Sequence, residues 1–388
     1  MTYHKPLRPI HRHHGHLSHF FDLTVQWFKK NIVLTIAFVA ALVTSCVVPP
    51  DAEYSSYFDW KTLTCLFCVL AVVCALKNIK FFTILARKIV DCTGNLRIAV
   101  LALVYITFIG SMLIANDMAL LTFLPLGFFV LSSTGKERYM AFVFIMQNIA
   151  ANLGGMLTPF GNPQNLYLYT KFQIPTLEFM QIMLLPFLAA IALITVCCLF
   201  LPKQVLSITE ECPYRLQPKR TVLYLILFVL SIIIVFRVIP YWIGLIVIPL
   251  VLMFADRQAL RAVDYPLLLT FVCFFIFAGN MARIPAVSSL FSSLMEQNPL
   301  LVSVLSCQVI SNVPSAILLS QFTANYPALL LGVNIGGTGT LIASLASLIT
   351  FREYTSHNPG KSGKYILLFS AFNFGFMILL TALAYFLI

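Results

Sequence analysis

The chain has 388 residues, of which 60% are hydrophobic and 10% are charged, and its mean hydropathy is +0.91. A water-soluble fold of this length needs far more polar surface, and the chain carries repeated apolar runs that are long enough to cross a bilayer. The composition therefore excludes a soluble protein and predicts an all-α polytopic membrane protein with the lipid bilayer as a partner.

The first 30 residues form a basic, histidine-rich tail. No short hydrophobic core with a small-residue cleavage site follows it, so we expect no signal peptide. His11, His13, His14 and His16 are candidate metal ligands, but a tail offers no preset geometry, and a solvated tail is the favoured interpretation. Cys65 and Cys68 form a CxxC without a second pair at zinc spacing, which predicts packed thiols.

About nine transmembrane helices are predicted along the chain, at residues 31–48, 62–76, 139–166, 179–201, 221–238, 241–254, 266–278, 327–350 and 365–388. Two further apolar stretches, 98–130 and 299–321, are interrupted near their middles. We interpret both as re-entrant hairpins, because a half such as 118–130 is shorter than the roughly 17 to 25 residues of a full span. A pair of short crossings is the alternative for each stretch.

The positions of the Lys and Arg residues in the predicted loops explain the net charge of +11. With the N-terminus in the cytoplasm, 21 of the 25 Lys and Arg residues fall on the cytoplasmic side and four, Lys61, Lys171, Arg237 and Arg283, on the other. This is the asymmetry of the positive-inside rule. It predicts a multi-pass protein of the cytoplasmic membrane with a cytoplasmic N-terminus, and it removes the need for a nucleic-acid partner.

Two stretches in the middles of predicted spans resemble each other. Residues 152–166 and 334–348 share Asn, Gly, Gly, Thr and Leu at five of fifteen positions without gaps. Upstream of each lies an interrupted apolar stretch with an Asn at the break, Asn116 in the first and Asn312 in the second. Farther upstream, Asp59 and Asp264 each open a span. The chain is therefore predicted to be a duplication.

The duplication defines the expected domain organisation. We assign residues 1–30 to the cytoplasmic tail, 31–202 to unit 1 with hairpin 98–130 and broken helix 139–166, 203–240 to a cytoplasmic loop and linking helix, and 241–388 to unit 2 with hairpin 299–321 and broken helix 327–350. A single linking crossing inverts the second unit relative to the first. Inverted repeats with paired broken segments are typical of secondary transporters.

The breaks carry residues that are expensive to place at membrane depth. Irregular backbone is tolerated there only where protein, water or ligand satisfies its polar groups. Glycines and prolines free carbonyl and N–H groups in the first break, and polar side chains add oxygens and donors. Such a break can hold a small cation, and the helix N-termini beyond it can hold an anion. A tolerated proline kink is the alternative, which the duplication disfavours.

Asp117 is the only one of 14 acidic residues in the middle of an apolar run. A charged carboxylate at the bilayer centre costs roughly 2.5 to 3.5 kcal/mol on insertion scales, so a functional use is favoured. Asp117 is the best single candidate for binding a coupling cation or a proton. The alternative is a helix cap, since Asn-Asp is suitable N-cap chemistry.

The two glycine-rich stretches, each preceded by an Asn-bearing hairpin tip, resemble the ion transporter superfamily, which includes arsenite permeases, NhaD-type antiporters, citrate transporters and divalent anion/sodium symporters. The resemblance covers residues 31–388. Its symporters usually carry Ser-Asn-Thr at both tips, whereas this chain has Ala-Asn-Asp and Ser-Asn-Val. The first tip is closer to the arsenite permease and antiporter branch.

The resemblance implies a scaffold, a transport domain that moves like an elevator, and a homodimer through the scaffold. It also implies two half-sites for substrate and ion, and the same residues are candidates for holding Na+. With Asp117 added, the candidate site residues are Asn116, Asp117, Thr158, Gly161, Asn162 and Asn165 in the first half, and Ser311, Asn312, Thr340, Ala343, Ser344 and Ser347 in the second.

These features predict a secondary active transporter that moves a small anion, an inorganic oxyanion or a carboxylate, coupled to Na+ or H+. Cation/proton antiport, with Asp117 binding cation and proton in turn, and arsenite-type metalloid efflux are the alternatives. An enzyme is not expected, because the sequence has no HExxH, no GxSxG and no histidine within a span. No cofactor is predicted beyond the coupling ion.

Overall fold

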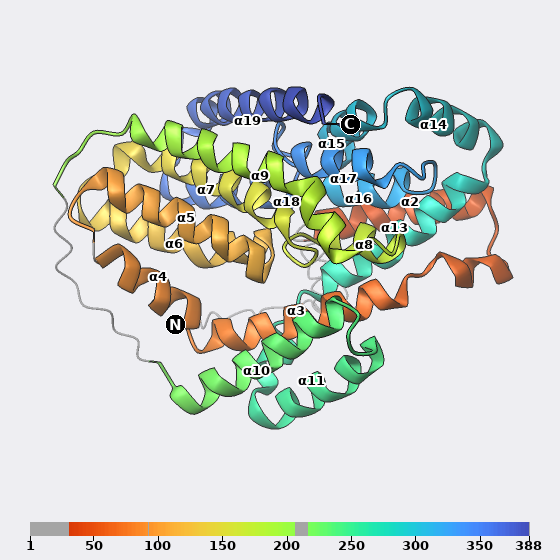
Figure 1. Ribbon diagram of the computed structural model, residues 1–388, viewed down its shortest axis with the longest axis horizontal. Helices are drawn as coiled ribbons and strands as arrows, with labels where there is room; N and C mark the ends of the chain where they lie inside the picture. The colour runs from red at the N-terminus through yellow and green to blue at the C-terminus, as the bar shows by residue number, and fades with distance from the viewer. Residues whose placement is uncertain (1–30, 92, 206–215, 388) are drawn as a thin grey trace, which may run out of the picture.

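Figure 1 shows the computed structural model, which describes residues 31–91, 93–205 and 216–387. Regular structure in these ranges is helical, apart from one isolated bridge between Asn95 and Val205. Eight of the described helices are long and apolar enough to cross a membrane. The all-α polytopic class is therefore confirmed. The histidine-rich tail lies outside the described residues, so its metal-binding alternative stays a prediction.

The first half of the chain contains α2 (Ile32–Val47), η1 (Ala52–Tyr57), α3 (Trp60–Asn78), α4 (Phe81–Asp91), α5 (Leu96–Ile114), α6 (Asn116–Ser133), η2 (Glu137–Tyr139), α7 (Met140–Gly154), η3 (Gly155–Leu157), α8 (Pro163–Lys171) and α9 (Thr176–Leu199). Helix α10 (Pro218–Val235) links the halves. The second half contains α11 (Tyr241–Ala255), α12 (Arg257–Arg261), α13 (Tyr265–Arg283), α14 (Pro285–Gln297), α15 (Pro299–Ile310), α16 (Asn312–Leu319), α17 (Tyr326–Ile335), α18 (Leu345–His357) and α19 (Ser362–Tyr385).

The helices are interrupted within the stretches in which the sequence predicted a break. Run 139–166 is split into α7 and α8, run 327–350 into α17 and α18, and the two other stretches break at Ala115 and Ser311. Helix α5 has 19 residues and α6 has 18, so both are long enough to cross, and the choice between a re-entrant hairpin and a pair of crossings stays a prediction. The helices continue past the apolar core through flanking residues such as Ser132 and Ser133. In the second stretch, α15 and α16 have only 12 and 8 residues.

The two halves contain corresponding elements in the same order. Helices α3 and α13 both begin after an aspartate cap: the Asp59 carboxylate accepts from the backbone N–H of Thr62, and the Asp264 carboxylate from that of Leu267, each at 3.0 Å. Such a cap satisfies a donor that the helix itself leaves unpaired. This correspondence supports the predicted duplication, whereas the inversion of the second unit stays a prediction.

The corresponding helices interlock between the halves. Helix α2 packs along α13, and α11 packs along α3, so the first helix of each half lies on the aspartate-capped helix of the other half. In Figure 1, α3, α10 and α11 lie together at the bottom of the view, and α5, α6, α7 and α9 form a separate group at the upper left. Helices α16 and α18 contact α8 and α6 respectively, which brings the two broken regions together.

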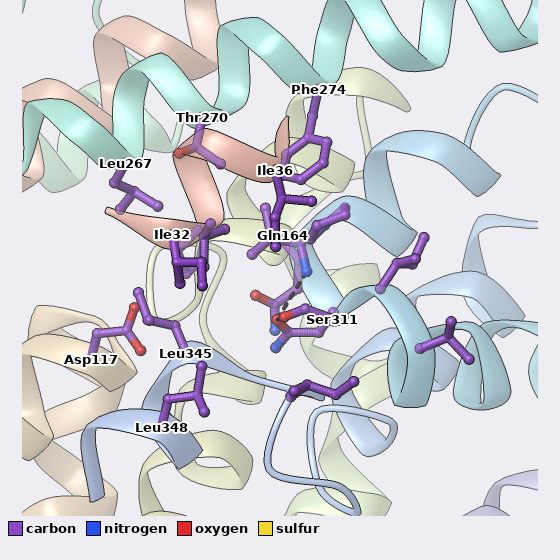
Figure 2. Close-up of a pocket in the computed structure, with 18 of the residues that line it drawn as sticks. Ile32, Ile36, Asp117, Gln164, Leu267, Thr270, Phe274, Ser311, Leu345 and Leu348 are labelled. Atoms are coloured by element: carbon purple, nitrogen blue, oxygen red, sulfur yellow. Dashed lines mark hydrogen bonds between the residues drawn. The ribbon is translucent and has the colours of Figure 1, made fainter. Parts of the chain in front are cut away.

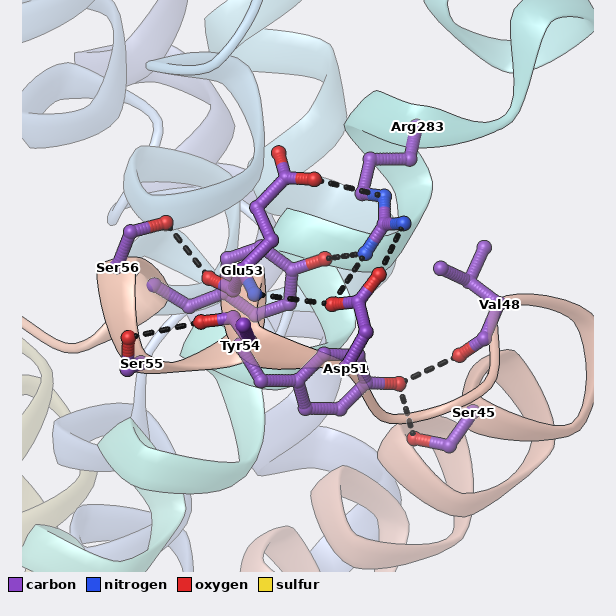
Figure 3. A network of polar contacts seen from close by, with 10 residues as sticks. Ser45, Val48, Asp51, Glu53, Tyr54, Ser55, Ser56 and Arg283 are labelled. Atoms are coloured by element: carbon purple, nitrogen blue, oxygen red, sulfur yellow. Dashed lines mark hydrogen bonds and ion pairs between the residues drawn. The ribbon is translucent and has the colours of Figure 1, made fainter.

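A polar network joins the far ends of α2 and α13 (Figure 3). The Arg283 guanidinium donates to the Asp51 carboxylate at 2.6 Å and to the Tyr57 hydroxyl at 3.0 Å, and it lies 3.4 Å from the Glu53 carboxylate. Hydrogen bonds from Arg283 hold the pKa of Asp51 below its usual range. An exposed ion pair such as Arg283–Asp51 adds little stability. Its main effect is to hold the segment after α2 against the end of α13.

Cysteine labelling tests the predicted orientation. The variants are made in a chain without its native cysteines. We expect Lys171→Cys to react with a membrane-impermeant maleimide from outside intact cells. Lys136→Cys and Lys203→Cys should react only after permeabilisation, because the charge asymmetry places both in the cytoplasm. Outside labelling at 203 and 136 with protection at 171 would reverse the topology.

Candidate functional site

Both hairpin tips turn at a residue with positive φ that is not glycine. Ala115 has φ 66° and ψ 152°, and Ser311 has φ 74° and ψ 161°. Glycine favours this region, and another residue there costs about 1–3 kcal/mol. After each turn an asparagine starts the next helix, and the side-chain oxygens of Asn116 and Asn312 accept from the following backbone N–H at 3.0 and 2.9 Å. The two tips therefore share one unusual local fold.

Asn165 closes the first break from within. Its side-chain amide donates to the backbone carbonyls of Gly155, Met156 and Thr158 at 3.1, 3.2 and 3.3 Å. Its side-chain oxygen accepts from the Asn334 amide at 2.6 Å. The carbonyls that the broken helix frees are thus satisfied by protein, as buried backbone requires. Asn165 therefore holds the break together, and its predicted part in binding an ion or substrate stays a prediction.

Asn162 sits where two glycine segments approach closely. Its amide donates to the Asn152 carbonyl and to the Asn334 side-chain oxygen, both at 3.2 Å. Its own side-chain oxygen is buried and has no hydrogen-bond partner in the described part of the chain. A Cβ at Gly155 would lie 2.3 Å from that oxygen, and one at Gly161 would lie 2.4 Å from the Gly155 carbonyl oxygen. Both glycines are therefore required for packing.

Gln308 binds the freed backbone groups of the second break, as Asn165 does in the first. Its amide donates to the carbonyls of Gly336 and Thr338 at 2.8 and 3.1 Å, and its oxygen accepts from the backbone N–H of Thr340 at 2.8 Å. The Thr340 hydroxyl donates to the Gln308 carbonyl at 3.2 Å. Gln308 was not among the predicted site residues, although a glutamine in an apolar helix three residues before a tip is a signal visible in the sequence.

The second tip is anchored on the second break. The Ala343 carbonyl accepts from the backbone N–H of Asn312 at 2.9 Å and from the Ser311 hydroxyl at 3.2 Å. Ser347 is buried one turn into α18, and no partner for its hydroxyl is found among the described residues. The tip and the break of the second half therefore form one unit.

Two asparagines connect the halves. The Asn152 side-chain oxygen accepts from the Asn116 amide at 3.1 Å and from the Ser344 hydroxyl at 2.9 Å, joining the first tip to the second break. Asn334, the corresponding residue of the second half, accepts from the amides of Asn162 and Gln164 at 3.2 and 3.4 Å. Both asparagines open the repeated stretches, yet neither was among the predicted site residues.

A cavity of about 500 Å³ lies between the two tips (Figure 2). Of the twelve predicted residues, Asn116, Asp117, Ser311 and Asn312 line it. The other eight do not line it and belong to the folded breaks around it: Thr158, Gly161, Asn162, Asn165, Thr340, Ala343, Ser344 and Ser347. Asn162 and Asn165 do not line this cavity, and their amides close the first break; their predicted part in binding stays a prediction.

Four helices begin on the cavity wall. The first residues of α6, α8, α16 and α18 are Asn116, Pro163, Asn312 and Leu345, and all four line the cavity. The N-terminal end of a helix carries a partial positive charge that favours an anion nearby, although at α6 and α16 the side-chain oxygens of Asn116 and Asn312 already accept from one first-turn N–H each. The cavity therefore has an electrostatic bias toward negative charge that comes from the backbone.

Two side chains of opposite charge line the same cavity. Asp117 is on the first tip, and one of its carboxylate oxygens is buried without a hydrogen-bond partner in the described ranges. It caps no helix in this structure, since the residue before α6 is Ala115 and α6 has no side-chain cap. The charge count placed Arg352 on the cytoplasmic side, and it lies in α18 on the face of Leu345 and Leu348, seven and four residues earlier. Within the described residues, neither Asp117 nor Arg352 forms an ion pair.

Metal-binding clusters are not found among the described residues, where no group of three or more His, Cys, Asp or Glu side chains comes together. Cys65 and Cys68 are buried in α3 as free thiols, as the packed-thiol interpretation expected. The Na+ site stays a prediction; side-chain oxygens of Asp117, Asn162 and Gln164 are buried without a hydrogen-bond partner in the described part of the chain.

Replacing Asn165 with alanine tests the closed break. We expect Asn165→Ala to destabilise the protein by about 1–3 kcal/mol, because three backbone carbonyls lose their shared donor. Thermal unfolding in detergent measures the loss. Asn78→Ala in α3 is the control and should cost less, because the one side-chain hydrogen bond it removes, to the Asp256 carboxylate at 3.0 Å, is exposed to solvent. An Asn165→Ala protein of unchanged stability but reduced transport would return Asn165 to the ligand site.

An all-helical membrane chain whose broken helices meet at a cavity has the architecture of a transport protein. The comparison with known families agrees: the profile described as citrate transporter matches residues 23–331. The chain belongs to the citrate transporter family, which is one of those named by the resemblance. The closeness of the first tip to the arsenite permease branch stays a prediction.

Curated relatives are also named as membrane or transport proteins. The chain is 32% identical to an uncharacterized transporter of Methanocaldococcus jannaschii over 84% of its own length and 89% of the relative's. It is 28% identical to the inner membrane protein YbiR of Escherichia coli over 77% and 81% of the two chains. The protein is thus a multi-pass membrane transporter and not an enzyme.

Proposed function

We propose that the protein is a secondary active transporter that moves a small anion, an inorganic oxyanion or a carboxylate, across the cytoplasmic membrane with Na+ or H+ as the coupling ion. The observation that carries this proposal is the start of four helices on one cavity wall. Each helix N-terminus favours a nearby anion by about 0.3–1 kcal/mol, and four act together. Membership of the citrate transporter family supports an anionic substrate.

Asp117 supplies a physical reason for coupling. A carboxylate on the wall repels an anion from the cavity unless a proton or a metal cation neutralises it. An anion and a cation therefore bind together more easily than the anion alone. This is the thermodynamic requirement for driving one solute by the gradient of another.

Cation/proton antiport is the second candidate, favoured by the unpartnered carboxylate oxygen of Asp117. In that case the cation and the proton compete for the same oxygen. Arsenite-type metalloid efflux is the variant that the Ala-Asn-Asp tip favours. Both alternatives use Asp117 and make less use of the four helix N-termini.

The proposed elevator motion carries the tips and breaks past the helices α2 and α13, which line the opposite side of the cavity. The cavity is lined by the start of α2 at Ile32, the start of α13 at Leu267 and Arg352 of α18. The charge asymmetry assigns these helix ends to the cytoplasm, so we propose an inward-facing state. A homodimer through the scaffold is proposed on the resemblance.

Uptake by proteoliposomes under an imposed Na+ or H+ gradient tests the function. We would screen sulfate, citrate, succinate, arsenite and sodium itself. Accumulation of an anion that collapses when the gradient is dissipated supports the proposal. Sodium flux driven by a proton gradient, with no anion accumulated, favours antiport instead.

A further inference from the structure

The two sides of the cavity differ in chemistry. Polar groups lie at the tips and breaks, on Asn116, Asp117, Gln164, Ser311 and Asn312. The opposite side is formed by α2 and α13, and apart from Thr270 its lining residues are apolar, among them Ile36 and Phe274 (Figure 2). A ligand that is polar over its whole surface leaves this apolar side without a matching partner.

The volume of the cavity indicates the size of the ligand. About 500 Å³ is within the range of sites for small organic molecules. A water occupies about 30 Å³ in the liquid, and an inorganic oxyanion is only a few times larger. Such an ion would leave most of the cavity to water against apolar side chains. An organic anion with a carbon body fills the space and covers the apolar side.

The charges limit how many negative groups the cavity accepts. Arg352 is the only cationic side chain that lines it, within the described residues, and Asp117 is the only anionic one. A guanidinium binds one carboxylate well, through two parallel hydrogen bonds. Beyond Arg352 the lining supplies only the partial charges of the four helix N-termini, against the full negative charge of Asp117, so two groups of a tricarboxylate would have no cationic side chain. With one cationic side chain, Arg352, in its lining, the cavity therefore favours a ligand with a single negative charge.

We propose that the cavity takes an organic monocarboxylate with an apolar body, held by Arg352 at its carboxylate and by α2 and α13 at its body. The proposal rests on the anion-transport function proposed above and selects the organic carboxylate over the inorganic oxyanion. It makes Arg352 a specificity-determining residue. It also separates this chain's substrate from the citrate that gives the family its name.

Thermal unfolding of the purified full chain in detergent tests the proposal, because at a fixed concentration a ligand raises the midpoint more the more tightly it binds. The probes are acetate, 4-methylpentanoate, the neutral 4-methylpentanamide, citrate and sulfate. We expect binding to tighten roughly fourfold per added methylene, since burying one is worth about 0.8 kcal/mol. The amide, citrate and sulfate should bind at least tenfold more weakly than 4-methylpentanoate.

Variants separate the two halves of the interaction. Arg352→Gln should weaken 4-methylpentanoate at least tenfold, whereas Arg352→Lys should retain part of the affinity. Phe274→Ala should reduce the preference for 4-methylpentanoate over acetate and leave acetate unchanged. Arg261→Gln is the matched control, because Arg261 is exposed in α12 and does not line the cavity.

The outcomes distinguish this proposal from the function on which it rests. If citrate or sulfate binds more tightly than 4-methylpentanoate and is accumulated by proteoliposomes, the transport function stands and the monocarboxylate proposal is overturned. If Arg352→Gln and Arg261→Gln behave alike, the role of Arg352 is overturned. If no anion stabilises the protein and none is accumulated, both proposals are wrong.

Discussion

We expect Asp117→Asn to lose gradient-driven accumulation in proteoliposomes by at least tenfold while substrate exchange across the same membranes persists. Asparagine keeps the shape of the side chain but cannot take up a proton or neutralise a metal cation. One carboxylate oxygen of Asp117 has no partner in the described structure, so the substitution breaks no hydrogen bond there. The effect should therefore fall on coupling and not on folding.

Concentrative uptake and exchange are measured in parallel, with Na+ and H+ gradients imposed separately. Asp256→Asn is the matched control, because Asp256 is also at a helix start but caps α12, where it accepts from the Ala259 backbone N–H at 3.1 Å. Accumulation at the wild-type level in Asp117→Asn, with unchanged dependence on both gradients, would remove Asp117 from the coupling mechanism.

We expect Gly155→Ala to prevent the first break from closing. The added Cβ would lie 2.3 Å from the side-chain oxygen of Asn162 and 2.7 Å from the backbone carbonyl oxygen of Gly161. The second contact is with backbone and cannot be relieved by a rotamer change, so the chain itself must shift. Overpacking of this kind typically costs about 1–3 kcal/mol, and here it also displaces the start of α8 from the cavity.

Size-exclusion chromatography and thermal unfolding in detergent measure the effect of Gly155→Ala, and proteoliposome uptake measures the loss of transport. Gly375→Ala in α19 is the control, because no atom lies within 4 Å of the position its Cβ would take. Alanine there should be neutral or slightly stabilising, as expected in a helix interior. Equal stability of the two variants would contradict the tight packing of the break.

The sequence by itself determined the class and the positions of the interruptions. Apolar runs long enough for a bilayer require helices, since no other open structure satisfies its backbone in lipid. Glycine, proline and asparagine at the breaks act locally, and the helices end at Gly154 and Ile335, as the repeated stretches indicated. Asp59 and Asp264 likewise open α3 and α13 as expected, because capping involves only neighbouring residues.

Only the tertiary structure decided which polar side chains face the cavity. Asn165 and Gln308 turn inward to satisfy freed carbonyls, whereas Asp117 keeps an unpartnered oxygen at the cavity. In irregular backbone no period fixes the direction of a side chain, so the sequence could not separate these roles. Two further features depend on how the two halves pack. They are the contact of Asn152 with Ser344 and the position of Arg352 on the cavity wall, which both involve residues remote along the chain.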